Sequence, residues 1–306
     1  MRILVYEHLT ALGIGRDPAD PQHAMYCEGR AMRDAVADDL ARIAGVVIAW
    51  QTPCDAAIVI APETDGILLE LSRSFPNAIG PSNEAIALTS DKLALAGHWR
   101  ENGVLTPATS ERAPAESELF PLVWKRRDGC GSTAAFLLEN RFDAAAAKAA
   151  IGAAEHAPMI LQEFVPGRAA SVAFLCGPEG NFPLIPCWQH LSADGRFQYL
   201  GGELPIPPEL GARAVELGRR AVACVPGLKG YIGVDLVLGD APDGSRDYAI
   251  EINPRLTTSY IGLRALAGFN LGEAMLRIAH GEAPPEMRWK TACLRFTAKS
   301  GPERFC

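Results

Sequence analysis

The chain has 306 residues, of which 48% are hydrophobic and 21% charged, and its formal net charge is −7. This length is enough for two or three domains. The negative balance, without a basic stripe, argues against a nucleic-acid partner, and no apolar run is long enough to span a membrane. None of the eight cysteines belongs to a CxxC or to a zinc-like cluster, a pattern typical of reduced thiols in the cytoplasm.

The first part of the chain alternates apolar strand patterns with helical periodicity. Strands are predicted over residues 3–6, 46–50 and 57–61, and helices over 28–43 and 66–74. This alternation predicts a small parallel sheet with helices on its faces. No GxGxxG follows the first strand, which disfavours a dinucleotide-binding fold.

A loop is predicted over residues 10–25, after the carboxyl end of the first strand, where open α/β sheets bind ligands. Glu7 and Glu28 border this loop. Each is interpreted either as a substrate contact or as a solvated charge.

A helix is predicted over residues 92–101, capped by Ser90 and Asp91. Lys92 then lies in its first turn, where a cation meets the positive end of the helix dipole. A nearby anion would remove this conflict.

The segment KRRDGCGST follows a strand predicted over residues 122–125. Lys125 closes that strand, and Gly129 and Gly131 supply a loop that can turn backbone N–H groups onto a phosphate. The Walker A order is absent, and a plain hairpin turn is the alternative. The other members of this loop are Cys130, Ser132 and Thr133.

A strand over residues 159–165 (MILQEFV) breaks at Pro166-Gly167 before the next strand, 171–176, and this break predicts a hinge between domains. Further strands are predicted over 183–191 and 197–200. Gly201 and Gly202 follow them, at a point where another backbone or a ligand can approach closely.

Two strands with a turn at Asp243-Gly244 are predicted over residues 231–238 and 248–252, and each carries one acid, Asp235 and Glu251. A carboxylate within a core strand costs several kcal/mol unless a cation lies against it. The interpretation is therefore a charged site, with a simple buried ion pair as the alternative.

Asn253 lies two residues after Glu251, on the same face of the strand. Oxygen ligands of this kind suit Mg²⁺ held jointly with phosphate. Arg255 adds a planar donor for phosphate or carboxylate. Thr257 and Thr258 come next, and they either line an amino-acid pocket, as Gln189, Gly201 and Gly202 also could, or cap the following helix.

The order of these parts resembles the ATP-grasp superfamily of carboxylate–amine ligases over essentially the whole chain. The motifs are Lys92, Lys125 with its glycine loop, LQEFVPG, Asp235 and EINPR. The resemblance implies an α/β (α+β) fold of three domains, with ATP between the last two. They are an N-terminal α/β domain (1–88), a central lid domain (89–165) and a C-terminal mixed-sheet domain (166–306).

The resemblance also implies a role for each matching residue. Lys92 and Lys125 would contact the ATP phosphates, and Arg255 would face the transferred phosphoryl group. Many members hold the ribose with an acid where this chain has Ala169, which leaves the grip on the ribose in doubt. The loop formed by Gly129, Cys130, Gly131 and Ser132 would close over the phosphates. Adenine would lie along Gln162, Glu163 and Val165. Two Mg²⁺ ions, or Mn²⁺, would be held by Asp235, Glu251 and Asn253.

Within the superfamily the chain is similar to the ligases that join tyramine or tyrosine to the γ-carboxylate of glutamate in methanofuran-type cofactor biosynthesis. The matching segments are Tyr6-Glu7, IAPETDGIL, RRDGCGS, QEFVPG, LGGEL after Gln189, and EINPRLTTSYIGL. The resemblance implies small amino-acid and amine substrates, an acyl-phosphate intermediate and a possible homodimer. A ligase that adds amino acids to a peptide or protein, and a non-catalytic nucleotide-binding module, remain alternatives.

Overall fold

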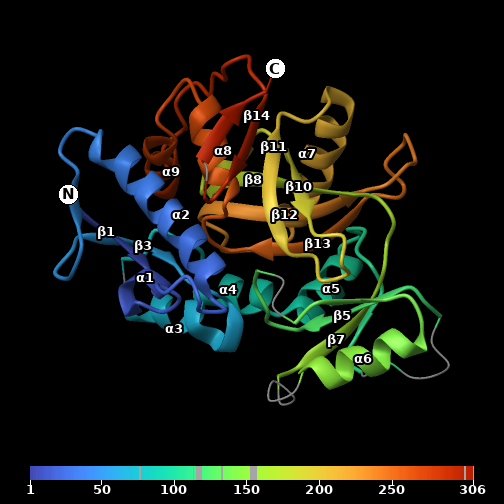
Figure 1. Ribbon diagram of the computed structural model, residues 1–306. Coiled ribbons are helices and arrows are strands. Elements are labelled where there is room, and N and C mark those ends of the chain that lie inside the picture. The colour runs from blue at the N-terminus through green and yellow to red at the C-terminus, as the bar shows by residue number, and fades with distance from the viewer. Residues whose placement is uncertain are drawn as a thin grey trace.

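The computed structural model describes residues 1–75, 77–112, 114, 119–131, 134–151, 157–299 and 301–305. Their strands form three separate sheets, and helices cover the faces of the first and the last (Figure 1). No helix in these ranges is long and apolar enough to cross a membrane.

The first sheet is parallel, with the order β2-β1-β3, and confirms the predicted parallel α/β unit. Two predictions were wrong in detail. The supposed loop after the first strand opens with a helix, because the Glu7 carboxylate accepts hydrogen bonds from the N–H groups of Leu9 (3.1 Å) and Thr10 (2.8 Å) and so caps it. The next helix also begins five residues earlier than predicted. The elements are β1 (Arg2–Glu7), α1 (His8–Leu12), α2 (His23–Ala41), β2 (Val47–Ala49), β3 (Ala56–Ile60), η1 (Thr64–Gly66) and α3 (Ile67–Ser74).

The second sheet is small and antiparallel, with the order β4-β7-β5-β6. One face is covered by α6, and a compact apolar core lies between them, built around Trp124, Phe136 and Leu138. In Figure 1 this sheet and α6 lie at the end of the molecule opposite the C-terminus. The elements are β4 (Thr109–Ser110), β5 (Leu122–Arg126), β6 (Phe136–Leu138), α6 (Arg141–Ile151) and β7 (Met159–Glu163).

The third sheet is antiparallel and runs in the order β13-β12-β8-β10-β11-β14-β15, with β9 also paired to β8. The single strand predicted over residues 183–191 is split between β9 and β10, and β15 was not predicted. The strands are β8 (Arg168–Gly177), β9 (Gly180–Pro183), β10 (Cys187–Leu191), β11 (Tyr199–Leu204), β12 (Gly230–Leu238), β13 (Tyr248–Asn253), β14 (Leu294–Thr297) and β15 (Gly301–Arg304).

The side chains of β8 point alternately to the two faces of the third sheet, and each face has its own hydrophobic core. Val172 and Phe174 pack toward α7, while Ala173 and Leu175 pack toward α2, α8 and α9. Trp99 of α5 joins the α7 side and donates from Nε1 to the Ala221 carbonyl at 3.1 Å. The helices are α4 (Asn83–Ser90), α5 (Lys92–Glu101), α7 (Pro208–Ala223), α8 (Ser259–Leu266) and α9 (Leu271–Ala279).

Helix α5 therefore packs with the third sheet, although the predicted boundary at residue 88 assigns it to the lid. The division at residues 88 and 165 remains a prediction. Among the described cysteines, Cys293 is disulfide-bonded, which departs from the expectation of reduced thiols throughout. The described cysteines with free thiols are Cys27, Cys54, Cys130, Cys176, Cys187 and Cys224.

A buried polar cluster fastens α2 to α8. The Asp39 carboxylate, 5% exposed, accepts hydrogen bonds from the Tyr260 hydroxyl at 2.8 Å and from Nη2 of Arg264 at 2.8 Å. Nε of Arg264 also donates to it. Because this carboxylate is buried with several donors, the cluster holds the first sheet and its helices firmly against the third.

Candidate active site

An irregularity in the β12–β13 pair turns two polar side chains toward a central cleft. Asp235 lies opposite Glu251, but the next pair joins Leu236 to Ala249, so Ile250 has no partner on β12. This extra residue is a β-bulge, which re-aims the side chains beside it. Ala249 packs in the core next to α7, whereas Glu251, two residues later, lines the cleft.

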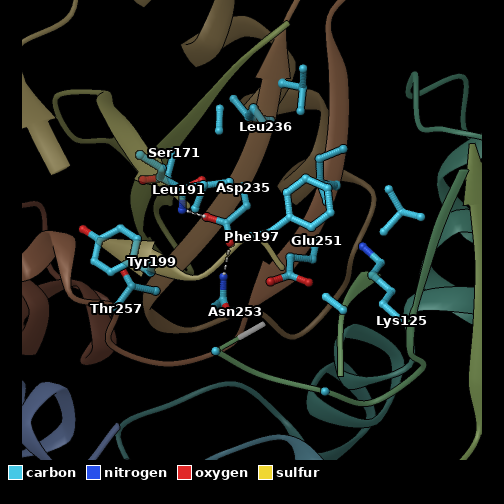
Figure 2. Close-up of a pocket in the computed structure, with 18 of the residues that line it drawn as sticks. Lys125, Ser171, Leu191, Phe197, Tyr199, Asp235, Leu236, Glu251, Asn253 and Thr257 are labelled. Carbon is cyan, nitrogen blue, oxygen red and sulfur yellow. Dashed lines mark hydrogen bonds between the residues drawn. The ribbon is translucent and has the colours of Figure 1, made fainter. Parts of the chain in front are cut away.

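The two acids lie together at the middle of the cleft with amides around them (Figure 2). Each oxygen of the Asp235 carboxylate accepts one hydrogen bond, Oδ1 from Gln189 Nε2 at 2.9 Å and Oδ2 from Asn253 Nδ2 at 3.0 Å. Burial, and then the charge of Glu251, raise the pKa of Asp235. Asn253 donates through its nitrogen, which leaves its Oδ1 oxygen for a cation.

Two lysines face these acids. The Lys92 ammonium lies 3.3 Å from the Glu251 carboxylate and donates to the Gly129 carbonyl, so Glu251 supplies the anion expected beside that helix start. Burial opposes the charge of Lys92, but Glu251 and Glu63 outweigh it and its pKa is raised. Burial, together with the nearby Lys92, lowers the pKa of Lys125 to about 8.

Arg255 forms a buried ion pair with Glu63, which the sequence analysis missed. Nη2 of Arg255 lies 2.9 Å from Oε2 of Glu63, yet Nε of Arg255 and Oε1 of Glu63 have no hydrogen-bond partner among the described residues. Glu63 follows β3, at the carboxyl end of a parallel strand. That position was the available signal, because such ends form ligand sites in α/β sheets.

The glycine loop is attached to the same turn after β3. Asp65 donates its N–H to Asp128 at 2.9 Å and accepts from Arg126 at 2.8 Å. Cys130 is buried and accepts a weak hydrogen bond from the Thr64 hydroxyl, 3.7 Å away. Burial, and then Glu63, raise the pKa of the Cys130 thiol, which argues against a nucleophilic role.

One cavity of about 520 Å³ gathers most of the predicted site residues. Ser132 and Thr133 lie outside the described residues, and Cys130 is buried beside the cavity without lining it. Lining residues not predicted include Ser171, Phe197 and Tyr199. The predicted residues that line it are Glu28, Lys92, Lys125, Gly129, Gly131, Gln162, Glu163, Val165, Gln189, Asp235, Glu251, Asn253, Arg255, Thr257 and Thr258.

Three predicted substrate contacts lie away from this cavity. Glu7 is buried as the cap of α1 and packs against Gly29, where an added Cβ would stand 2.4 Å from the Glu7 carboxylate. The close approach expected at Gly201 and Gly202 is real, but the neighbour is Phe296 of β14. A Cβ at Gly201 would meet its carbonyl at 2.6 Å, and one at Gly202 would meet its ring at 2.4 Å. Both glycines serve strand packing.

Two parts of the chain match models of known protein families. A family model described as an ATP-grasp domain matches residues 89–259, and one described as a pre ATP-grasp 3 domain matches residues 32–86. The chain belongs to the ATP-grasp family. The resemblance to the ATP-grasp superfamily is therefore confirmed, and ATP is the nucleotide that this family indicates.

Two relatives of this ATP-grasp chain are tyramine–L-glutamate ligases. The enzyme of Methanocaldococcus jannaschii is 31% identical over 254 residues, 79% of this chain and 68% of the relative. The enzyme of Methanocaldococcus fervens is 30% identical over 247 residues, which cover 79% of this chain and 71% of the relative. An ATP-grasp superfamily protein from Archaeoglobus fulgidus has a similar structure, with a TM-score of 0.71 and 25% identity over 96% of this chain and 92% of that one.

Proposed function

We propose that this ATP-dependent C–N ligase joins the amine of tyramine or tyrosine to the γ-carboxylate of glutamate, as a step in the biosynthesis of a methanofuran-type cofactor. The observation that carries the proposal is the convergence of Asp235, Glu251 and Asn253 with Lys92, Lys125 and Arg255 on one cavity. The names of the two relatives support the choice of substrates.

The nucleotide would lie along the seam between the second and third sheets. Lys92 and Lys125 would contact its phosphates beside Gly129 and Gly131, in the loop that also holds Cys130 and Ser132. Adenine would lie against Gln162, Glu163 and Val165. The Glu163 N–H already donates to the Ala108 carbonyl at 2.9 Å, so the main chain of Glu163 could pair with a base only through its carbonyl oxygen.

The acids at the centre fit a magnesium site. Asp235, Glu251 and the free amide oxygen of Asn253 are hard oxygen donors, which Mg²⁺ and Mn²⁺ accept. No group of three His, Cys, Asp or Glu side chains in the described part of the chain could hold a metal. Nucleotide phosphates and water would therefore complete the shell, as is usual for Mg²⁺. Bound Mg²⁺ would neutralise the charge that develops between the β- and γ-phosphates.

The chemistry would proceed in two steps. A carboxylate oxygen of glutamate attacks the γ-phosphorus, the bond to the β-phosphate oxygen breaks, and ADP leaves with an acyl phosphate formed. The neutral amine then attacks the acyl carbon, phosphate leaves, and the nitrogen loses a proton. Lys92, Lys125 and Arg255 would offset the negative charge on the transferred group.

Product analysis tests this proposal. With ATP, Mg²⁺, glutamate and tyramine, mass spectrometry should detect γ-glutamyltyramine together with ADP, and parallel incubations with tyrosine identify the preferred amine. Glutamate labelled with ¹⁸O in its γ-carboxylate should transfer one labelled oxygen to phosphate. Unlabelled phosphate would exclude the acyl phosphate. ADP release only with peptide acceptors, or ATP binding without turnover on any amine, would favour the two alternatives.

A further inference from the structure

The cavity has a second end, beyond the acids and away from Lys125. In Figure 2 Tyr199 and Thr257 lie on one side of Asp235, while Lys125 lies on the other. We name this end the distal subsite and define it by six residues that line the cavity: Glu28, Met32, Ser171, Tyr199, Thr257 and Thr258. It is lined by hydroxyl groups, apolar surface and a single carboxylate.

The hydroxyl groups beside this subsite are hydrogen-bonded to one another. The Tyr231 hydroxyl lies 2.8 Å from that of Ser259 and 3.1 Å from that of Thr257, and these two are 2.8 Å apart. Burial, and then Cys187 and Glu28, raise the pKa of the Tyr199 phenol well above its usual range. All these groups are therefore neutral near pH 7, and none of them balances the charge of Glu28.

Glu28 itself lacks a direct counter-ion. No Lys, Arg or His nitrogen in the described ranges lies within 4.0 Å of its carboxylate. The cation whose charge acts on it is Arg255, which is paired at 2.9 Å with Glu63. One arginine thus serves two carboxylates, and one negative charge is in excess whenever Glu28 is ionised. Burial raises the pKa of Glu28 to about 7, against the opposing effects of Arg255 and a hydrogen bond with Thr258.

The backbone fixes this carboxylate at the cleft. Glu28 is on α2, and the next residue, Gly29, packs directly on the Glu7 carboxylate at the end of β1. Met32, one turn further along α2, lines the same cavity. The helix therefore cannot move away from the cleft without breaking the packing of Gly29 and the Asp39 cluster at its other end.

We propose that the distal subsite binds the primary ammonium group of a substrate, with Glu28 as its counter-ion. A carboxylate beside a threonine hydroxyl offers an ammonium group acceptors for its three N–H bonds. This inference rests on the proposed function, whose two substrates each carry a primary amine. The ammonium is either the α-ammonium of glutamate or that of the amine before it loses its proton.

The test compares Glu28→Gln with Asp34→Asn, a matched control on the same helix. Asp34 is exposed and pairs with Arg33. Michaelis constants for tyramine, glutamate and ATP are measured by ADP release. Glu28→Gln should raise KM for one amine-bearing substrate at least about tenfold and leave that for ATP within about twofold. Asp34→Asn should change none of them.

Glutarate, which lacks the α-amino group, separates the two sources. If Glu28 binds the α-ammonium of glutamate, wild type and Glu28→Gln should have the same KM for glutarate. If it binds the amine, the increase in KM for tyramine should persist with glutarate as the acid. Unchanged KM values for both tyramine and glutamate would overturn the inference, as would a parallel increase in KM for ATP, because that would indicate loss of Arg255 alignment alone.

The inference and the proposed function can fail separately. Turnover by the wild type without an effect of Glu28→Gln rejects the ammonium site alone. If the wild type does not turn over, thermal shifts with tyramine and with its hydroxyl analogue 4-hydroxyphenylethanol, and with glutamate and glutarate, test the site by binding. The site is supported if the amine compound stabilises the wild type, its amine-free analogue does not, and the amine compound no longer stabilises Glu28→Gln. The site is rejected if these three combinations give the same thermal shift.

Discussion

Two buried arginine–carboxylate pairs join the N-terminal segment to the third sheet, and they differ in how completely they are hydrogen-bonded. Both oxygens of Asp39 are engaged by Arg264 and Tyr260. In the Glu63–Arg255 pair, Oε1 of Glu63 and Nε of Arg255 have no partner within the described residues. Asp39 and Arg264 of the first pair do not line the cleft, whereas Arg255 of the second does.

The difference shows how a structural pair and a functional pair can be told apart. A fully bonded buried ion pair mainly maintains the fold, because removal of one partner strands the other charge. An ion pair that faces a cavity and has an unpaired donor and an unpaired acceptor can form further hydrogen bonds with a ligand. The Glu63–Arg255 pair therefore belongs to the chemistry of the cleft.

The largest effect on activity should come from the acids of the cleft. Asp235→Asn should lower the rate of ADP release by about 1,000-fold or more, because a ligand for the cation is lost. Its free energy of unfolding should change by less than about 1 kcal/mol, because relief of the repulsion by Glu251 offsets a weakened hydrogen bond. Urea denaturation measures the free energy of unfolding, and an assay of ADP release measures the rate. A fully active Asp235→Asn enzyme would refute the metal assignment.

The matched pair Arg255→Met and Arg264→Met sharpens the comparison directly. Arg255→Met should reduce kcat/KM by about 100-fold or more through loss of charge stabilisation. Arg264→Met should instead lower the free energy of unfolding by about 3 kcal/mol, since the buried Asp39 is left with the Tyr260 hydroxyl and an exposed Arg42 at 3.9 Å, with activity retained below the new midpoint of unfolding. Because Arg255→Met also leaves Glu63 buried without its partner, activity separates the two variants, and an equal loss of kcat/KM in Arg264→Met would break the distinction.

A smaller effect is expected from the pH dependence of stability. The pKa of Glu28 is raised from 4.5 to about 7, so between these values the folded state keeps a proton that the unfolded state has lost. Stability of the ligand-free protein should therefore fall as pH rises through this window. Glu28→Gln should lack this fall and be more stable than wild type by about 1 kcal/mol near pH 7.5, after allowance for partial exposure.

Urea denaturation without nucleotide at about pH 5 and about pH 7.5 measures this difference. Asp34→Asn should follow the wild type at both values. A Glu28→Gln variant with the wild-type pH dependence would mean that Glu28 keeps its usual pKa in the folded protein.

The smallest effect is expected at Cys130. Cys130→Ala removes one buried sulfur beside the glycine loop and its weak contact with Thr64. ADP release should stay within about threefold of the wild-type rate, because no step needs a thiol and only packing is lost. A complete loss of activity, with the fold intact by circular dichroism, would assign the thiol a chemical role.

Local sequence patterns predicted the helices and strands that are determined by their own residues and caps. The strands around Asp235 and Glu251 follow from apolar runs and a DG turn, and the helix at Lys92 follows from its Asp91 cap. The start of α2 was missed because Gln22 provides no side-chain cap and no acid stands in the first turn; His23 instead contacts the Gly15 carbonyl of the preceding loop. At Gly201 and Gly202 the sequence left both a backbone and a ligand open as the close neighbour, because Phe296 lies almost a hundred residues away in the chain and meets them only through the order of the third sheet.

The same limit applies to the site. Acids within apolar strands signal a charged centre, so Asp235 and Glu251 could be predicted from their own surroundings. The partner of Arg255 could not, because Glu63 reaches it only when the first sheet docks on the third. The bulge at Ile250, which turns Glu251 to the cleft, also has no local signal, since it depends on the register with β12.

Glu28 and Glu63 come from the segment before residue 88, whereas Lys125, Asp235 and Glu251 come from later stretches. The proposed counter-ion of the substrate ammonium thus comes from the N-terminal segment, whereas the rest of the distal subsite and the residues that would activate a carboxylate come from later stretches. Exchange of the N-terminal segment between related ligases would therefore exchange this carboxylate and keep the residues that activate the acid, provided that the contacts of Asp65 with the glycine loop are kept.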